Sequence, residues 1–390
     1  MEGIYLDNNA TTKLDGRVFA AMRSYLTNHF GHPSSSHVLG TKVRQKVEES
    51  RDLVAVLLGT THPDEIVFTS GGTESINTAI KGVLAASPSR RHVITTKVEH
   101  ISVLNVCRYL AGQGYRIAYL SVDKNGNLAL DELRKSLSDD TAIVSVMWAN
   151  NETGVIFPIE KIGEIVKQRG ILFHVDAVQA VGRIPINLRS LPQVDLLSVS
   201  GHKFHAPKGV GALFVRRGTK LHPLIAGGPQ EGMRRAGTEN VASIIGMGKA
   251  AELVPIYLNE ENSRVRKLRD KLETDVIEGI PETRVNGDRQ ARIPNTTSIT
   301  FSGLDGRKLL RAMEQDEIYA SSGAACTEGK TPSHVLLAMG LTREDALSSV
   351  RFGLSRYNAD GEIDYVVGSL KRIVSQLRTT INPVQRAASQ

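Results

Sequence analysis

The chain of 390 residues is 41% hydrophobic and 23% charged, with a net charge of +7 at neutral pH. Its length suits two domains, or one large and one smaller lobe, and its composition is that of an ordinary soluble globular protein. No apolar run approaches the ~18 residues of a membrane span, and the amino terminus lacks the basic flank and apolar core of a signal peptide. We therefore expect a cytoplasmic protein that does not enter a membrane.

The charge and the cysteines exclude further classes of function. A positive net charge would suit an acidic partner, but the sequence has neither a basic block nor interleaved basic and aromatic residues, so it predicts no nucleic-acid binding. The two cysteines cannot form a disulfide framework and lack the spacing of metal ligands, so no metal site is expected. Cys107 lies in an apolar helical pattern and is most simply a core residue.

The amino-terminal stretch begins with a short predicted strand at Tyr5 that runs into polar turn residues. Asn8 and Asn9 favour a turn there, and hydrogen-bond donation into a site is the alternative. Helices are predicted over residues 16–26 and 38–58, with a loop between them.

Between residues 65 and 215, apolar strand patterns alternate with helical ones. Strands are predicted at residues 65–69, 92–96, 116–120, 142–147, 171–175, 196–199 and 211–215, and helices between the first five at 73–84, 102–110, 130–137 and 159–168. This alternation predicts an α/β fold with a mostly parallel sheet between helices. Ligands of such sheets bind beyond the carboxyl ends of the strands. Polar clusters follow five of the predicted strands: Gly71 to Thr73, His100, Asn151, Asp176, and Ser200 to Lys203.

From about residue 240 the pattern changes to that of a smaller α+β domain. Residues 241–276 are predicted to be largely helical, with a break at Pro255. Strands are then predicted at 297–301, 318–320 and 350–353, and helices at 306–313, 333–338 and 361–377. The polar tail, residues 379–390, contains Pro383 and is predicted to be disordered.

The predicted strand at residues 196–199 delivers Lys203 at its tip. A lysine after a strand is usually a surface residue, but one held partly out of water shifts toward the neutral amine and can form a Schiff base with an aldehyde. Two other stretches favour the second interpretation. Asp176 could hold a pyridinium nitrogen, and the Gly71-Gly72-Thr73 turn at a helix amino terminus could bind a phosphate. Together the three describe a site for pyridoxal phosphate (PLP).

Three further polar residues fit such a site. A single histidine such as His100 more often has a structural role. In a PLP site, however, an imidazole is expected to stack on the pyridine ring. Gln179, three residues after Asp176, is placed to hydrogen-bond the phenolic oxygen of the ring, and Asn151 could do similar work or cap a turn.

Six motifs in order resemble the NifS/IscS group of cysteine desulfurases, which are class V, fold-type I PLP enzymes. The resemblance covers about residues 5–377 and is closest to the nitrogenase-associated NifS branch, on the stretches His205-Ala-Pro-Lys-Gly209 and Arg234-Arg-Ala-Gly-Thr-Glu-Asn240. The motifs are Tyr5-Leu-Asp-Asn-Asn-Ala-Thr-Thr12, Phe68-Thr-Ser-Gly-Gly-Thr-Glu-Ser75, Ala149-Asn-Asn-Glu-Thr-Gly154, Ser200-Gly-His-Lys203, Arg235-Ala-Gly-Thr-Glu-Asn240 and Ser321-Ser-Gly-Ala-Ala-Cys326.

The resemblance implies the fold-type I architecture: a large PLP-binding domain over residues 15–240 and a small α+β domain from residues 1–14 and 241–378. It also implies a homodimer, in which Thr238 reaches the PLP phosphate of the other subunit. Within one subunit, Lys203 would hold PLP covalently and His100 would stack on its ring. The phosphate would be bound by Gly72, Thr73, Ser200 and His202, and the ring edge by Asp176, Gln179 and Asn151.

The implied reaction converts L-cysteine to L-alanine. Lys203 would remove the α-proton, and Arg351, assisted by Asn8, would bind the substrate carboxylate. Cys326 would be the nucleophile that takes the sulfur as a persulfide and passes it to an iron–sulfur scaffold protein. The sequence leaves open whether the sulfur serves nitrogenase or housekeeping cluster assembly.

The sequence departs from the family pattern at two places. His32 stands where asparagine is usual, and the cysteine loop from Cys326 to Pro332 is one residue shorter than usual and carries Lys330. Two alternatives of function remain open at this level. A selenocysteine lyase or a class V aminotransferase could use the same lysine and aspartate, and a sulfur-trafficking module without catalysis could retain the fold.

Overall fold

The computed structural model describes residues 3–322 and 331–388, with the backbone alone described for residues 381–388. At its centre lies a sheet of seven strands in the order β2-β8-β7-β6-β5-β3-β4. Only β8 runs antiparallel to its neighbours in this sheet. The strands are β2 (Ile66–Thr69), β3 (His92–Thr96), β4 (Arg116–Leu120), β5 (Thr141–Met147), β6 (Leu172–Asp176), β7 (Leu196–Ser200) and β8 (Gly211–Val215). The seven predicted strands and the predicted α/β fold class are confirmed.

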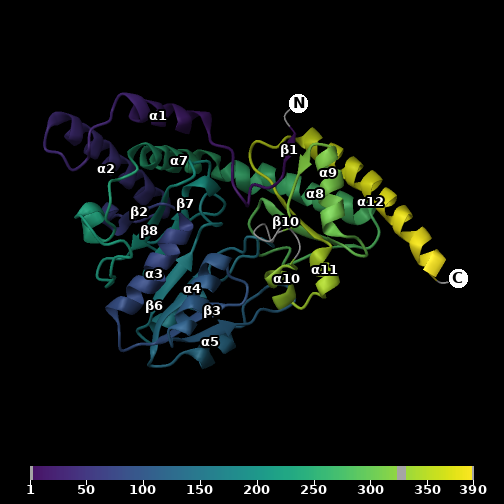
Figure 1. Cartoon of the computed structure of the whole chain (residues 1–390), viewed down its shortest axis with the longest axis horizontal. Helices are drawn as coiled ribbons and strands as arrows, with labels where there is room; N and C mark the ends of the chain where they lie inside the picture. Colours follow the sequence, from purple (N-terminus) through teal and green to yellow (C-terminus); the bar gives the residue numbers. More distant parts are fainter. Residues whose placement is uncertain (1–2, 323–330, 389–390) are drawn as a thin grey trace.

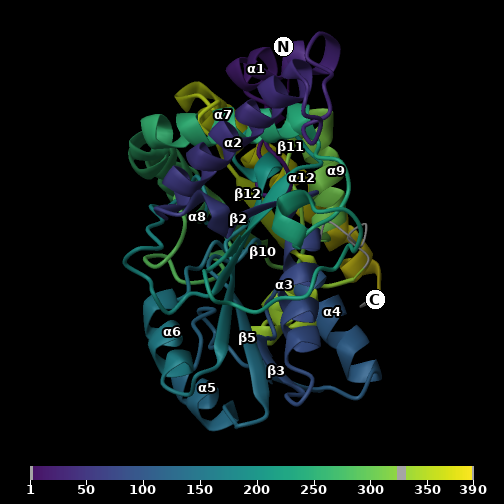
Figure 2. The same ribbon diagram turned by 90° about the vertical axis from the view of Figure 1, so that its left-hand side faces the viewer.

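Helices cover both faces of this sheet because its strands are apolar on both sides. Ile66 and Phe68 of β2 pack into one apolar cluster, and Val67 between them packs into another on the opposite face. Figure 2 shows α3 (Gly72–Ala86) and α4 (Ile101–Gly112) on one side of the sheet, and α5 (Leu130–Ser136) and α6 (Ile159–Lys167) on the other. Such double coverage is typical of parallel strands that read as continuous apolar runs.

Helix α7 (Val241–Glu260) packs along α1 (Gly16–Thr27) and α2 (Val38–Leu58). The predicted break at Pro255 is wrong: the helix continues to Glu260, where a π-helical turn, Glu261–Val265, joins it to α8 (Arg266–Gly279). Pro255 is exposed, and the buried apolar residues around it hold the helix against its neighbours. The apolar residues of α7 belong to the same cluster as those of α2, whereas the sequence pattern predicts that this helix is part of the small domain.

The segment Val241–Gly279 is long and apolar enough, by length and composition alone, to cross a membrane. The expectation that no apolar run approaches that length is therefore wrong here. Within the protein, 61% of its apolar window is buried. A helix packed on both α1 and α2 explains this composition, because core helices are apolar on several sides.

A second apolar cluster joins Leu6 to residues between Val265 and Val374. It packs between the antiparallel sheet β12-β10-β9 and helices α8 and α9 (Gly306–Gln315). In Figure 1 this unit lies to the right of the large sheet, and both chain termini lie on its side. The strands are β9 (Thr283–Val285), β10 (Thr296–Phe301) and β12 (Ser349–Gly353), and short helices α10 (His334–Ala338) and α11 (Arg343–Leu347) lie between them in the chain. The domain boundaries remain a prediction.

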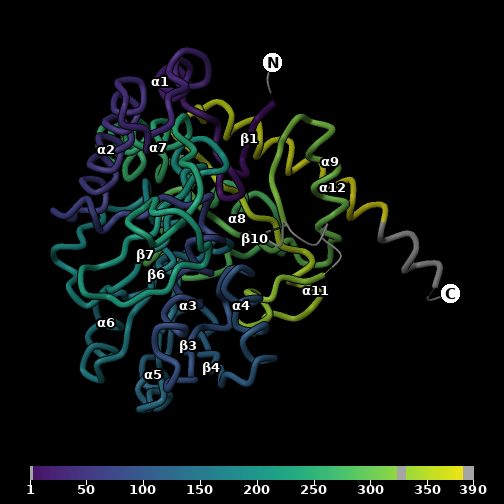
Figure 3. Tube along the Cα trace, turned by 60° about the vertical axis from the view of Figure 1, so that its left-hand side comes forward, coloured from purple at the N-terminus to yellow at the C-terminus, as the bar shows by residue number. Residues whose placement is uncertain are grey.

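The two ends of the chain both join this second unit. Strand β1 (Ile4–Tyr5) pairs in parallel with β11 (Ile318–Tyr319), and Figure 3 follows the purple segment from β1 across to α1. At the other end, α12 runs from Asp360 to Ala388, so the described part of the predicted disordered tail, residues 379–388, is helical. Extending an anchored helix needs no new nucleation, and therefore polar residues can continue it without a core.

Candidate active site

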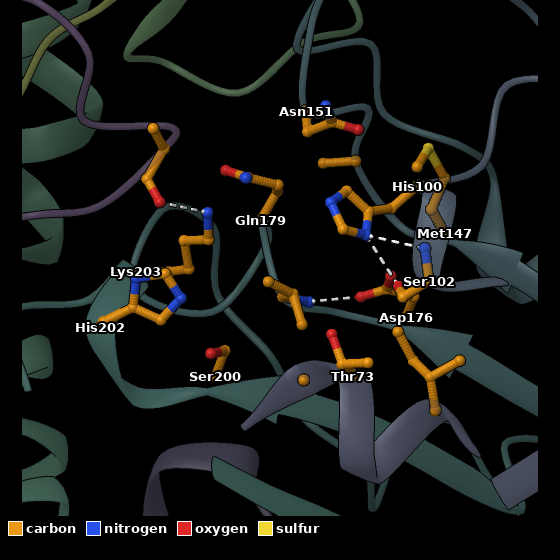
Figure 4. A pocket seen from close by; sticks show the side chains of 15 residues that line it. Thr73, His100, Ser102, Met147, Asn151, Asp176, Gln179, Ser200, His202 and Lys203 are labelled. Carbon is orange, nitrogen blue, oxygen red and sulfur yellow. Dashed lines mark hydrogen bonds between the residues drawn. The ribbon is translucent and has the colours of Figure 1, made fainter. Parts of the chain in front are cut away.

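A cavity of about 260 Å³ lies beyond the carboxyl ends of β5, β6 and β7, beside the amino termini of α3 and α4 (Figure 4). This is the edge of the sheet at which the sequence predicts a ligand. The predicted residues that line the cavity are Gly72, Thr73, His100, Asn151, Asp176, Gln179, Ser200, His202 and Lys203.

Lys203 ends a short 3-10 turn that follows β7. Its Nζ donates hydrogen bonds to the backbone carbonyls of Asn9, at 2.5 Å, and Ala10, at 2.8 Å. Burial, reinforced by the nearby charge of Arg351, lowers the pKa of Lys203 to about 8. The amine is therefore largely desolvated, held in place by neutral acceptors and close to its neutral form at physiological pH.

Asp176 is the last residue of β6, and its side chain is buried. Burial raises the pKa of Asp176 to about 6, although the backbone N–H of Val178, 3.0 Å from Oδ1, and the charge of Lys203 act in the opposite direction. Above this pH the Asp176 side chain is a carboxylate anion that can accept further hydrogen bonds besides the one from Val178. Such an anion fits the protonated ring nitrogen of PLP.

The opposite end of the cavity suits a phosphate. Gly71 has a φ of +153°, and a Cβ on Gly72 would lie 2.8 Å from Cγ2 of Val178, so glycine is required for this close turn. The turn opens α3, a helix of 15 residues whose first N–H groups have no acceptor within the helix. Thr73, Ser200 and His202 add hydroxyl and imidazole groups to the same end. A dianionic phosphate is favoured at such a helix amino terminus.

His100 caps the amino terminus of α4 and projects into the cavity (Figure 4). Its Nδ1 accepts from the backbone N–H of Ser102 at 3.2 Å and lies 2.7 Å from the Ser102 hydroxyl oxygen. Burial, followed by the charge of Lys203, lowers the pKa of His100 to about 4. The ring is thus neutral at physiological pH, with its proton on Nε2, and this state suits stacking on an aromatic ring.

Asn151 is the clearest sign that the cavity is built for a polar ligand. Its side-chain oxygen Oδ1 is buried, yet it has no hydrogen-bond partner among the described residues. A buried acceptor without a donor is costly. The residues of the cavity therefore fit PLP: an amine for its aldehyde, an anion for its ring nitrogen, a helix amino terminus for its phosphate and an acceptor for its edge.

The amino-terminal turn closes the cavity on one side. The carbonyl of Asn9 accepts from Gln179 Nε2 at 3.0 Å as well as from Lys203, and the Thr12 hydroxyl donates to the carbonyl of His202 at 2.8 Å. These bonds join the amino-terminal segment to the turns that follow β6 and β7, between 170 and 194 residues further along the chain. A short segment of a dozen residues therefore fixes the lysine turn.

Comparison with known proteins identifies the family to which this arrangement belongs. The model of the aminotransferase class-V family matches residues 4–366. This chain belongs to the aminotransferase class-V family.

Several relatives that match nearly the whole chain are named as cysteine desulfurases. A cysteine desulfurase of a Nostoc species is 52% identical over 379 residues, which are 97% of this chain and 94% of that protein. The cysteine desulfurase NifS of Azotobacter vinelandii is 50% identical over the same coverage. A solved structure described as a NifS-like protein has a TM-score of 0.91 at 39% identity, covering 96% of this chain and 100% of that one. The predicted resemblance to the NifS/IscS desulfurases is confirmed, and with it the enzyme class.

Three of the predicted residues that the structure describes lie outside the cavity lining. Arg351, on β12, reaches the edge of the site and donates from Nη1 to the carbonyl of Asn151 at 2.9 Å. The amide of Asn8 donates to the carbonyls of Tyr5 and Gly353, which is the turn-forming alternative. Thr238 is exposed and lies 3.3 Å from His32 Nε2. Cys326 lies outside the described residues.

Two features of this site are not predicted by the sequence: the carbonyls that hold Lys203 and the ion pair of Asp7. The backbone carbonyls of Asn9 and Ala10 hold Lys203, and no side-chain pattern announces a carbonyl. Asp7 pairs with Arg351, with Oδ1 2.6 Å from Nη2. The sequence could have predicted this ion pair. A buried guanidinium requires a counter-charge, and Asp7 is the carboxylate in the motif that begins at Tyr5.

Proposed function

We propose that the protein is a PLP-dependent L-cysteine desulfurase, which converts L-cysteine to L-alanine and receives the sulfur as a persulfide on Cys326. The observation that carries this proposal is the presence in one cavity of a half-buried amine with a lowered pKa, Lys203, and a buried carboxylate, Asp176. Relatives at 50% and 52% identity named as cysteine desulfurases support the choice of substrate over amino-group transfer.

PLP, when bound, supplies an aldehyde that combines with amines and a ring that accepts an electron pair from the substrate. Lys203 would hold the aldehyde, and Asp176 would keep a proton on the ring nitrogen. The α3 amino terminus with Thr73, Ser200 and His202 would bind the phosphate. The stacking residue would be His100, and Gln179 and Asn151 would hold the ring edge.

The remaining steps belong to the chain's own groups. Lys203 Nζ, neutral above pH ~8, can take the α-proton of the substrate and return it. Arg351, whose side chain is 3% exposed, would bind the α-carboxylate and so orient the Cα–H bond. A thiolate on Cys326 would take the sulfur. Cys107 cannot do this, because burial raises the pKa of its thiol to about 12 within the α4 core.

The direct test uses the purified protein with PLP, L-cysteine and a thiol. We expect a coloured protein that forms alanine and sulfide in equal amounts. A protein that stays colourless after PLP is added would instead be a trafficking module without catalysis. Transfer of the amino group to a keto acid would indicate an aminotransferase.

The titrations of Lys203 and Asp176 predict how PLP capture by the apoprotein depends on pH. At pH 7.5 a lysine of pKa ~8 is about one-quarter neutral, compared with about 0.1% for an ordinary lysine. The capture rate should therefore rise as pH increases through ~8 and then level off. Below pH ~8 it should fall about tenfold per pH unit as Lys203 becomes protonated, and more steeply below pH ~6, where Asp176 becomes neutral.

This profile is measured by stopped-flow absorbance with apoprotein and PLP. Asp176→Asn should remove the extra steepness below pH ~6 and keep the lysine-dependent rise, which should move to lower pH because the charge of Asp176 raises the pKa of Lys203. A rate that still climbs above pH 9.5 would show that Lys203 is not the group that reacts, or that its pKa is not depressed.

We further propose a cytoplasmic homodimer that passes its sulfur to an iron–sulfur scaffold protein, with nitrogenase as one destination. The surface over α1, α2 and the loop between them supports a second copy, because it exposes large apolar side chains that water solvates poorly. These are Phe19, Leu26, Phe30, Val38 and Leu39, with exposures of 52%, 63%, 79%, 65% and 50%.

If the partner's Thr238 completes the phosphate site, Thr238→Ala should release PLP several-fold faster on dialysis than the parent. Dilution of the parent to monomer should have the same effect. Thr219, a half-buried threonine in the turn after β8 that does not line the cavity, provides the matched control as Thr219→Ala. PLP retention that is independent of both Thr238 and protein concentration would contradict a shared site.

A further inference from the structure

The guanidinium of Arg351 is only partly satisfied in the structure. It is buried, with a side chain 3% exposed, beside the cavity. Its Nη2 donates to Asp7 Oδ1 at 2.6 Å and its Nη1 to the carbonyl of Asn151 at 2.9 Å. Its third nitrogen, Nε, is buried and has no hydrogen-bond partner in the described part of the chain.

The unused nitrogen lies on the same edge of the guanidinium as the nitrogen that Asp7 holds. The N–H bonds of Nε and Nη2 run parallel, and this edge is the one that binds both oxygens of a carboxylate. Asp7 supplies one oxygen to this edge and leaves the other donor without an acceptor. An unpaired donor in a buried position is unfavourable, so the edge is complementary to a carboxylate that engages it fully.

Asp7 can leave this edge without disturbing its own backbone. Its side chain is 21% exposed, so water is available to it once it rotates away. Its backbone is held independently: the carbonyl accepts from the Tyr5 hydroxyl at 3.1 Å and from the N–H of Ala10 at 2.9 Å. The turn that supports Lys203 therefore does not depend on the ion pair.

We propose that Asp7 is an internal carboxylate that occupies the substrate-carboxylate position on Arg351 and is displaced when substrate binds. The inference rests on the proposed function, which provides Arg351 with an α-carboxylate. Because one carboxylate replaces another, the buried guanidinium is paired before and after binding. A carboxylate ligand can bind only to molecules in which Asp7 has left Arg351. The apparent affinity for every carboxylate ligand is therefore reduced in proportion to that fraction of molecules. Amines without a carboxylate do not compete with Asp7 for Arg351, so Asp7 reduces the preference of the site for carboxylate ligands over such amines.

The test compares Asp7→Asn with the parent holoenzyme, using two fragments of cysteine as probes. 3-Mercaptopropionate keeps the carboxylate and lacks the amine, whereas cysteamine keeps the amine and lacks the carboxylate. In the variant, the KM for L-cysteine and the inhibition constant of 3-mercaptopropionate should each fall about three- to tenfold. The dissociation constant of cysteamine should stay the same. A merely structural role for Asp7 would raise all three.

Thermal unfolding gives a second readout that needs no turnover. Removing the counter-charge should lower the Tm of the free variant, and saturating 3-mercaptopropionate should raise the Tm of the variant by more than that of the parent. Asp7→Ala should behave in the same way, in case the asparagine amide binds Arg351 itself. Asp64→Asn, which removes a carboxylate from an exposed pair with Arg217, controls for net charge and should change none of these values.

The outcomes separate the two proposals. A parent enzyme that makes no alanine from L-cysteine would refute the proposed function, while the Tm shifts would still test Asp7. An active parent with weaker or unchanged binding of 3-mercaptopropionate to both Asp7 variants would overturn the inference. An equal change for cysteamine would overturn it too, because the effect would then not depend on the carboxylate.

Discussion

Lys203→Ala is expected to abolish alanine formation from L-cysteine, with a loss of at least about 10³-fold, because in the proposed function Lys203 is both the amine that holds PLP and the base that takes the α-proton. Sodium borohydride followed by mass spectrometry should find PLP attached to the parent protein and none attached to the variant.

The fold should survive this change. The sheet does not depend on the lysine tip, and the variant loses only the two hydrogen bonds to the carbonyls of Asn9 and Ala10. Exposed Lys208, five residues along, supplies the matched control: Lys208→Ala should retain the attached cofactor and the activity. Normal alanine production by Lys203→Ala would show that another group performs the chemistry.

Cys326→Ala is expected to separate the early from the late half of the reaction. The variant keeps the whole described cavity, so it should bind PLP and show spectral changes when L-cysteine is added. It should form no protein-bound persulfide and almost no alanine, because nothing takes the sulfur.

Cys107→Ala is the control that the chain itself offers, since the sequence holds two cysteines. Cys107 is fully buried in the cluster between α3 and α4, so its replacement should leave activity intact and lower the free energy of unfolding by about 1–2 kcal/mol through a small cavity. The measurements are alanine yield and cyanolysis of bound persulfide on both variants. Persulfide on Cys107, or parent rates in Cys326→Ala, would refute the assignment of the nucleophile.

The sequence predicts the fold well where a residue's neighbours in the chain determine its environment. For example, the apolar run of β5 predicts a buried strand, and every residue of β5 is buried. The cavity residues at the strand ends follow from the same logic, because parallel strands bring their carboxyl ends to one edge. Asp176 and Lys203 are therefore placed in the same site before any contact is known.

The sequence fails where the partner is a distant group without a pattern. Arg351 and Asp7 are 344 residues apart, and their pairing depends on β12 meeting the amino-terminal turn. The carbonyl acceptors of Lys203 are equally hidden. Local signals also mislead: Pro255 indicates a break and the polar tail indicates disorder, yet packing along α7 and propagation of α12 override both.

The long-range contacts of the amino-terminal turn determine when the site can form during synthesis on the ribosome. Asn8 bonds to a carbonyl 345 residues further along the chain, and the lysine turn is completed by carbonyls from the same early segment. At synthesis rates of about 5–20 residues per second, these first residues wait about 20–70 s for their partners. A nascent or truncated chain therefore lacks the neighbours that complete the proposed substrate-carboxylate position at Arg351, and this position forms only when nearly all of the chain has been made.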